Sequence, residues 1–220
     1  MVKFLDMELD LNDECFQPNT VTKLFAQNID PMGKTVLDLG CGVGAVGIHF
    51  MKNGAEECVG VDIYDGHVSY ATQNTVTNGV TMEVLQSDIY SNLTTQKFDI
   101  IASDISGCAK EIADITTWFP KNVPTPENGW ELTVAAITDS KQYLNPNGEF
   151  YSAVLSFSDR DKIDEAFNNT YGDDWSILFE KNIVFSPELY ANKEIACKYP
   201  YEEKRNRLFW TFYMYRGINK

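Results

Sequence analysis

A short apolar run followed at once by closely spaced glycines constrains the fold of this chain most strongly. The run and the glycines are Val36, Leu37, Leu39, Gly40, Gly42 and Gly44. Such a run is typical of a strand that is buried on both faces of a sheet. Glycines let the backbone turn sharply and approach a ligand without a Cβ in the way. Residues 45–51 then predict a helix whose first N–H groups point across the turn, so the stretch predicts a cofactor-binding loop.

Strand-like and helix-like segments alternate through the first two thirds of the chain. We expect strands at 36–39, 57–63, 80–85, 98–104 and 149–157, and helices at 20–28, 45–54, 66–77 and 160–168. Two more strands, 175–184 and 208–216, have no clear helix between them and are expected to form an antiparallel pair at the sheet edge. The predicted fold class is therefore α/β: a Rossmann-like doubly wound sheet of seven strands, mostly parallel with an antiparallel last strand, with helices on both faces.

A single domain is the expected organisation of the 220 residues. Residues 1–34 would supply an N-terminal arm and helix, 35–157 the cofactor-binding core, and 158–220 a C-terminal helix and strand pair. Long connections at 105–129 and 186–206 interrupt the alternation. Ligands bind outside the carboxyl ends of the strands in such sheets, and the first connection starts there, so it is a candidate substrate loop.

The composition excludes several classes of site and partner. A formal net charge of −14 disfavours nucleic acid as a partner, because nucleic-acid binders need basic surfaces. No stretch is apolar enough to span a membrane, and acids occupy the first residues, where a secretory signal would be apolar. We therefore expect a cytoplasmic protein with no membrane partner. The 5 cysteines are scattered without a C-x-x-C pair and the histidines number 2, so neither a disulfide framework nor a metal site is expected.

Two cofactor classes fit the glycine loop. The spacing of Gly42, Gly44 and Gly47 matches a dinucleotide fingerprint, and Asp62 follows near the distance expected for an acid that binds ribose hydroxyls. Asp38 precedes the loop. A carboxylate repels a pyrophosphate and attracts an ammonium or sulfonium group, so Asp38 favours S-adenosylmethionine over a dinucleotide.

Residues 36–44 resemble the first motif of the class I S-adenosylmethionine-dependent methyltransferases. The resemblance implies S-adenosylmethionine as the cofactor, with Asp62 on its ribose, Asp88 at the adenine amino group and the backbone of Ile89 beside the ring. The cofactor-binding residues that it implies are Asp38, Gly40, Cys41, Gly42, Gly44, Asp62, Ile63, Asp88, Ile89 and Thr20. His67 follows Asp62 closely, and either borders the adenosine or stands at an exposed helix start.

Within that class the chain is most similar to the release-factor glutamine methyltransferases and the small-domain methyltransferases. Phe16, Pro18 and Thr20 resemble a motif near the start of those enzymes. That group carries Asn-Pro-Pro-Tyr after the fourth strand, where this chain has Asp-Ile-Ser-Gly at 104–107. Asp104 accepts hydrogen bonds only, so it could orient or deprotonate an amine, whereas glutamine-amide and nucleobase acceptors are disfavoured. The alternative role for Asp104 is to cap the next turn.

These features predict N-methylation of a small-molecule or peptide acceptor. Asp104 is the candidate catalytic residue, and the candidate substrate-binding residues are Asp104, Ile105, Ser106 and Trp118. Two alternatives stay open: a methyltransferase that acts on protein or RNA, and a non-catalytic module that binds S-adenosylmethionine.

Charged and aromatic residues around Asp104 extend the predicted acceptor site. The acids Glu111 and Asp114 are expected near it and would suit a cationic or amine acceptor. The aromatic residues Phe119 and Trp130 lie in the candidate substrate loop and are expected to wall the site. Trp210, in contrast, alternates with other aromatic residues along the last strand and is expected to pack in the core.

Overall fold

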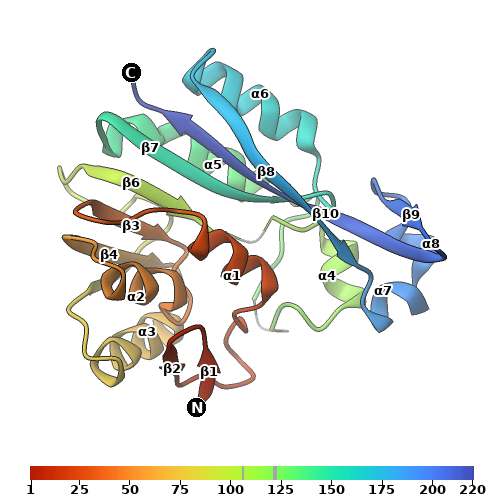
Figure 1. Cartoon of the computed structure of the whole chain (residues 1–220), viewed down its shortest axis with the longest axis horizontal. Coiled ribbons are helices and arrows are strands. Elements are labelled where there is room, and N and C mark those ends of the chain that lie inside the picture. Colours follow the sequence, from red (N-terminus) through yellow and green to blue (C-terminus); the bar gives the residue numbers. More distant parts are fainter. Residues whose placement is uncertain (106, 121–122) are drawn as a thin grey trace.

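The computed structural model describes residues 1–105, 107–120 and 123–220 (Figure 1). One mixed sheet forms its middle layer. The strands follow one another across the sheet in the order β5 (Glu83–Gln86), β4 (Glu57–Asp62), β3 (Thr35–Leu39), β6 (Phe98–Ser103), β7 (Leu144–Leu155), β10 (Arg207–Ile218) and β8 (Trp175–Val184). The first five are parallel, and β10 runs antiparallel to both of its neighbours. This arrangement confirms the predicted fold, with the short strand β9 (Glu202–Lys204) added against β10.

Alternate residues of the central strands face two separate cores. Val36 of β3 contributes to one core together with the helices α1 (Thr20–Gln27), α2 (Ala45–Lys52) and α3 (Asp65–Thr77). Leu37 contributes to the opposite core, together with α5 (Glu131–Asp139) and α6 (Arg160–Tyr171). Both side chains have no exposed surface, which explains why β3 reads as a continuous apolar run rather than as an alternating one.

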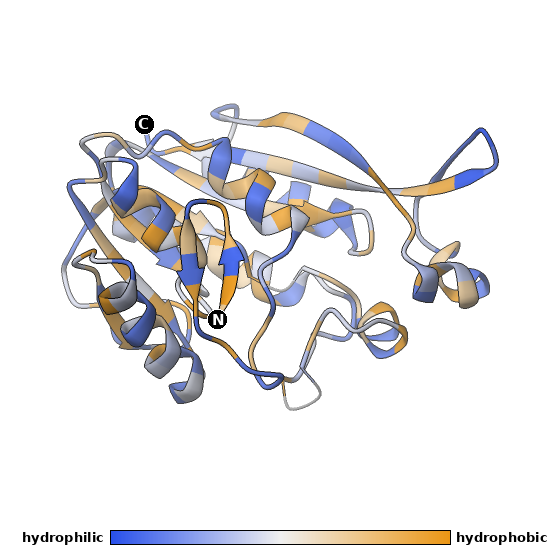
Figure 2. Cartoon of the chain, turned by 60° about the horizontal axis from the view of Figure 1, so that its bottom comes forward, coloured by the Kyte–Doolittle hydropathy of each residue, from blue (hydrophilic) through white to orange (hydrophobic). Residues whose placement is uncertain are grey.

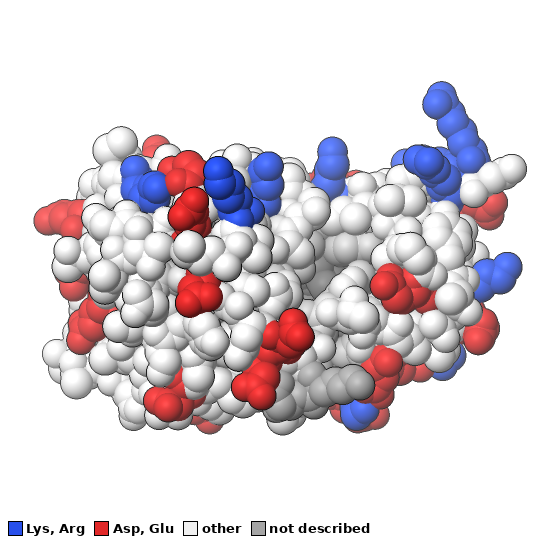
Figure 3. All heavy atoms as spheres, turned by 90° about the horizontal axis from the view of Figure 1, so that it is seen from below, with Lys and Arg blue, Asp and Glu red and all other residues white. Residues whose placement is uncertain are grey.

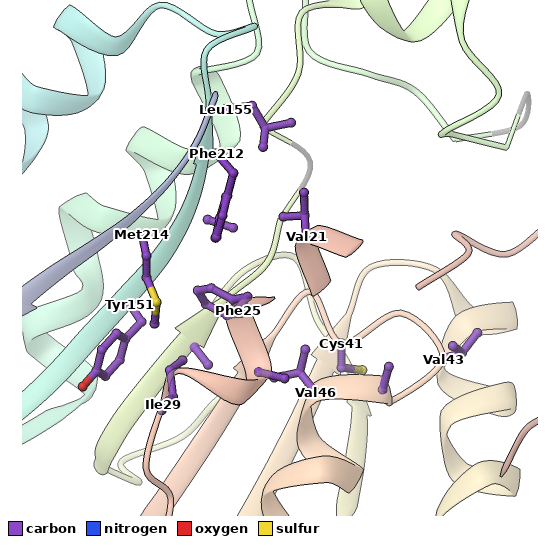
Figure 4. Close-up of a cluster of buried hydrophobic side chains, with 14 of the residues drawn as sticks. Val21, Phe25, Ile29, Cys41, Val43, Val46, Tyr151, Leu155, Phe212 and Met214 are labelled. Atoms are coloured by element: carbon purple, nitrogen blue, oxygen red, sulfur yellow. The ribbon is translucent and has the colours of Figure 1, made fainter. Parts of the chain in front are cut away.

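Helix α1 begins where the sequence predicts it, because Asn19 caps it. The Asn19 side chain accepts a hydrogen bond from the Val21 N–H, and the Thr22 hydroxyl accepts one from the Asn19 N–H, which together form a capping box. In Figure 4, Val21 and Phe25 project from α1 toward Phe212 of β10, and both are buried. Burial of this apolar face fixes α1 against the sheet.

The N-terminal segment folds into a hairpin of β1 (Val2–Phe4) and β2 (Met7–Leu9) that lies against α3. Two asparagines one turn apart, in α3 and directly after its end, hold the segment. Asn74 bonds the N–H and the C=O of Asp10 at 2.7 and 2.9 Å. Asn78 bonds the N–H and the C=O of Glu8 at 3.1 and 2.7 Å. Each amide thus pairs with the backbone as a neighbouring strand would.

The two long connections contain helices that sequence periodicity did not predict. α4 (Lys110–Ile115) and α5 lie between β6 and β7, and η1 (Ser140–Tyr143) leads into β7. α7 (Pro187–Ala191) and α8 (Lys193–Ala196) lie between β8 and β10 and pack against α4. The far ends of β8 and β10 extend past the rest of the sheet toward these short helices (Figure 2). α5 was missed because its buried face includes Thr133 and Ala136, which give a weak apolar period.

The remaining strand boundaries differ little from those expected, except at β7. This strand starts at Leu144, which pairs with Phe98, and the register then shifts before Glu149 pairs with Ile100. In the described part of the chain, no helix combines the length and the apolar character needed to cross a membrane. No group of three or more His, Cys, Asp or Glu side chains that could hold a metal occurs within the same residues.

Candidate active site

A cavity of about 580 Å³ lies at the carboxyl ends of the parallel strands. Leu39, Val61 and Asp104 line it where β3, β4 and β6 end, as expected for a doubly wound sheet. Residues 16–22 and the connection after β6 cover its other sides. Figure 3 shows a hollow in this face of the molecule, bordered mainly by residues that carry no charge.

Asp62 occupies the end of β4 as a fixed hydrogen-bond acceptor. Its Oδ2 accepts the Gly42 N–H at 2.9 Å, and its Oδ1 accepts the Tyr64 N–H at 3.0 Å. The Nδ1 of His67 lies 3.1 Å from the same Oδ1. The carboxylate is 8% exposed and faces the cavity. A carboxylate offers roughly four acceptor positions, so Oδ2 keeps capacity for a ligand hydroxyl.

His67 is part of the site, and its ring is held on two sides. Besides Asp62, the ring bonds the backbone carbonyl of Glu14. Both partners only accept hydrogen bonds, so the doubly protonated ring satisfies both. The hydrogen bond with Asp62 raises the pKa of His67, in spite of burial. The histidine therefore lines the cavity rather than standing at an exposed helix start.

The glycine loop has backbone angles that residues with a side chain rarely adopt. Gly40, Gly42 and Gly44 have φ angles of +75°, +53° and +85°. A Cβ on Gly40 would also lie 2.9 Å from Cγ1 of Ile105. Gly40, Cys41 and Gly42 line the cavity, which brings the loop backbone to the ligand.

Asp38 lies below the glycine loop. Its Oδ2 accepts the Gly47 N–H at 2.7 Å, which ties the end of β3 to the first turn of α2. The side chain is 1% exposed and does not line the cavity, and neither does Gly44. Burial raises the pKa of Asp38 to about 7, against the Gly47 hydrogen bond, and the charges of Asp104 and Asp62 raise it further. The structure therefore gives Asp38 a structural contact within the loop.

The turn after β5 closes the same end of the cavity. Ile63, Ser87, Asp88 and Ile89 all line it, next to Asp62. Ile89 has a φ of +50°, an uncommon conformation for a β-branched residue. The Ser87 hydroxyl bonds the Ile89 carbonyl at 3.0 Å and holds this turn. Strain of this kind is concentrated at functional sites.

Asp104 lines the cavity and directly follows β6. Burial raises the pKa of its carboxyl to about 7, and a hydrogen bond from the Thr22 hydroxyl lowers it. Thr22 is 4% exposed and lies in the cavity lining with Thr20 and Ile105. Sequence reasoning missed Thr22, although its position three residues after the cap Asn19 marks a side chain fixed by the helix start. Ser106 lies outside the described residues.

Aromatic side chains form another part of the cavity lining. The rings of Trp118 and Trp210 lie 5.5 Å apart between centroids, and so do those of Phe16 and Phe119. All four line the cavity. Trp210 also packs in the core, as expected, but its place in the lining was not predicted. Its position opposite Ile183 in the sheet, unknown from the sequence, is what brings it there.

Three residues expected near the acceptor lie elsewhere. Glu111 pairs with Lys198 at 2.7 Å, and Asp114 pairs with Lys110 at 2.5 Å. Neither acid is in the cavity lining, nor is Trp130, which packs against the core formed by α5 and α6. The expectation failed because α4 turns its acids toward lysines at the surface.

Known proteins with a similar sequence point to one family. Residues 17–104 match the methyltransferase small domain family. A protein of Methanocaldococcus jannaschii with the provisional name protein N5-glutamine methyltransferase is 34% identical over 102 residues, which cover 46% of this chain and 51% of that protein. Ribosomal protein L11 methyltransferase of Thermosipho africanus is 37% identical over 116 residues, covering 52% of this chain and 42% of the relative. The matched part of the chain is thus similar to class I S-adenosylmethionine-dependent methyltransferases.

Solved structures agree with this methyltransferase fold. Ribosomal protein L11 methylase from Lactobacillus delbrueckii subsp. bulgaricus superposes with a TM-score of 0.57 at 17% identity, covering 88% of this chain and 75% of the other. The 16S rRNA N2 G1207 methyltransferase of T. thermophilus, solved with AdoMet and guanosine, gives a TM-score of 0.56 at 17% identity over 91% and 42% of the two chains. The chain spans about half the length of the curated relatives that it matches.

The residues present fit S-adenosylmethionine, the cofactor of this class. Asp62 offers an acceptor to a ribose hydroxyl, and the space beside Gly42, which lines the cavity, is open. Asp88 and Ile89 border the same end of the cavity. The aromatic residues of the lining remain available to a second ligand, the acceptor of a transfer reaction.

Proposed function

We propose that this chain transfers a methyl group from S-adenosylmethionine to a nitrogen atom of a small-molecule or peptide acceptor. The observation that carries the proposal is that Asp62, Asp104 and a group of aromatic residues line one and the same cavity. S-adenosylmethionine supplies an activated methyl group on a sulfonium. The protein has to align the acceptor nitrogen with that methyl group and keep its lone pair free.

Asp104 is the group proposed to meet the acceptor nitrogen. A carboxyl with a pKa of about 7 can take a proton near neutral pH, and its ionised form can orient an N–H. Thr22 is proposed to hold the carboxylate in place through its hydroxyl. Ile105 and Trp118 are proposed to bound the acceptor, and Thr20 to contact the cofactor.

Transfer to a protein is the second candidate function. It is favoured by the similarity to ribosomal protein L11 methyltransferases. Transfer to RNA has less support, because no Lys or Arg is found among the described residues that line the cavity. A module that binds the cofactor without transfer is the third possibility, and the assay below separates all of them.

A cytoplasmic location is part of the proposal. All five cysteines are free thiols and four of them are buried, which suits a reducing compartment.

The test is a labelled-methyl assay with the purified chain and a cell extract split into small-molecule, peptide, protein and RNA fractions. Label in a small-molecule or peptide fraction is expected, and Asp62→Ala should abolish it. Label in the protein or RNA fraction alone would replace the main proposal with the second candidate. Binding of S-adenosylhomocysteine without label in any fraction would favour the non-catalytic module.

A further inference from the structure

The acceptor end of the cavity has a built aromatic wall, which we call the aromatic chamber. Its rings are Phe16, Trp118, Phe119 and Trp210. They come from the N-terminal arm, the connection after β6 and the strand β10. Phe157, which has no exposed surface, contacts Trp118 and Trp210 with ring centroids 5.9 and 5.5 Å away. The two tryptophans are therefore held from behind before any ligand arrives.

The walls between these rings are also apolar. Leu155 of β7 and Ile183 of β8 complete the lining on the sheet side, and Val123 and Pro124 lie on the loop side. Ser186, a polar residue at the rim, accepts the Leu189 N–H and caps α7. An acceptor rich in hydroxyls would lose its hydrogen bonds to water here without replacement.

The described lining of the cavity contains few charged side chains. The ionisable residues of the described lining, thiols and phenols aside, are Asp62, His67, Asp88 and Asp104. The first three lie together at the end of β4 and the turn after β5, where the cofactor residues gather. Asp104 follows β6, the strand that leads into the connection carrying Trp118 and Phe119. Among the described lining residues, a carboxylate or phosphate acceptor would meet the like charge of Asp104 and no Lys or Arg, whereas an amine would meet its counter-charge.

We propose that the acceptor is a small amine with an apolar, ring-containing body, whose nitrogen lies at Asp104 and whose ring lies in the aromatic chamber. This inference rests on the proposed function and specifies its substrate. Aromatic rings favour offset or edge contacts with other rings, which the two pairs of rings in the chamber can supply. A protonated or methylated nitrogen is further stabilised by nearby ring faces.

The transfer balances with Asp104 as the proton acceptor. The acceptor enters as an ammonium and gives one proton to the Asp104 carboxylate. The nitrogen lone pair then forms a bond to the methyl carbon. The bond between this carbon and sulfur breaks, and the electron pair of the broken bond stays on sulfur. The product leaves as a methylammonium, and Asp104 returns its proton to solvent.

The test uses the purified full chain, labelled S-adenosylmethionine and a matched panel of acceptors. The panel holds 2-phenylethylamine and tryptamine, the alcohol and carboxylic acid of the same phenyl skeleton, butylamine, and a lysine-containing peptide. Methylation of the two arylalkylamines is expected, with kcat/KM at least tenfold above that for butylamine and none for the alcohol or acid. Equal transfer to the alcohol, or transfer to the peptide alone, would overturn the inference while leaving methyl transfer intact.

Two variants separate the chamber from general folding effects. Trp210→Leu should raise KM for the arylalkylamines at least tenfold and leave the affinity for S-adenosylhomocysteine within twofold. Trp175→Leu removes an aromatic residue that stacks on Tyr215 away from the cavity, and should leave KM unchanged. Equal effects of the two variants on KM would contradict the inference. Failure of the wild type to bind S-adenosylhomocysteine at all would overturn the proposed function itself.

Discussion

The Nδ1 of His67 lies 3.1 Å from the Oδ1 of Asp62, and the same ring bonds the Glu14 carbonyl. One histidine ring thus joins the carboxylate expected to hold the ribose to the segment that leads from β2 to α1. Phe16 and Thr20, which follow Glu14, line the cavity. The cofactor site and the covering N-terminal segment are therefore coupled through one titratable side chain.

Replacing His67 should weaken cofactor binding through this link. His67→Gln keeps a polar side chain but loses the charge and one of the two contacts. We expect a loss of about 1–2 kcal/mol in the affinity for S-adenosylhomocysteine, measured by titration calorimetry. His49→Gln is the control, because His49 pairs with Asp6 away from the cavity. Equal affinities of the two variants would show that the His67 contact has no role in binding.

The glycine loop and the alternation of strands and helices along the chain could be predicted from the sequence, because both rest on local signals. Apolar runs, glycine spacing and the acid at Asp62 are readable without tertiary contacts. Asp104 could be singled out for the same reason, since it directly follows a strand. The partners of these residues could not be predicted. Thr22 reaches Asp104 only because α1 packs on the sheet.

The acceptor end was less predictable than the cofactor end. Trp210 enters the cavity lining because of the register of β10 between β7 and β8, which its alternating pattern does not specify. Glu111 carries a charge that suits the expected acceptor, yet it pairs with Lys198, 87 residues away in sequence. Residues in long connections are positioned by such distant contacts rather than by local pattern.

Removing the Thr22 hydroxyl should change the titration of Asp104. The hydroxyl lowers the pKa of this carboxyl, so Thr22→Val is expected to move the pKa upward from about 7. The acid limb of the pH profile of kcat/KM should shift toward alkaline pH by the same amount. Thr72→Val, in an exposed position of α3, is the matched control. An unshifted acid limb in Thr22→Val would show that this limb does not report the titration of Asp104.

The stability of the ligand-free protein should fall as the pH rises from about 4 to about 7. Asp38 and Asp104 have pKa values of about 7 in the folded chain and an ordinary value of 3.8, so the folded state binds protons more tightly over this range. His67, whose pKa is also raised, contributes stability that is present below its ordinary pKa of 6.5 and is lost as the pH rises through the raised value.

Melting temperatures measured from pH 5 to pH 8 check this trend. Asp38→Asn should flatten the decline, while Asp114→Asn, at an exposed ion pair, should not. A melting temperature that rises steadily across the interval would contradict the raised pKa values.

The paired asparagines of α3 should contribute unequally to stability. Asn74 has no exposed surface and bonds both the Asp10 backbone and the Val43 carbonyl, so Asn74→Ala leaves buried polar groups without partners. We expect a loss of roughly 2–4 kcal/mol in the free energy of unfolding. Asn78→Ala, at a more exposed site, should cost about 1 kcal/mol. Urea titration measures both, and equal losses would exclude burial as the cause of the difference.

Methyl transfer by Asp104→Asn tests the central claim most directly, when the affinity for S-adenosylhomocysteine is measured on the same samples. The asparagine keeps the shape of the side chain but can neither accept a proton nor carry the charge. We predict unchanged affinity within about twofold and a loss of transfer of about 10²–10⁴-fold, the usual contribution of a positioned acid or base. Transfer by Asp104→Asn at the wild-type rate would contradict the assignment of Asp104 as the residue that acts on the acceptor.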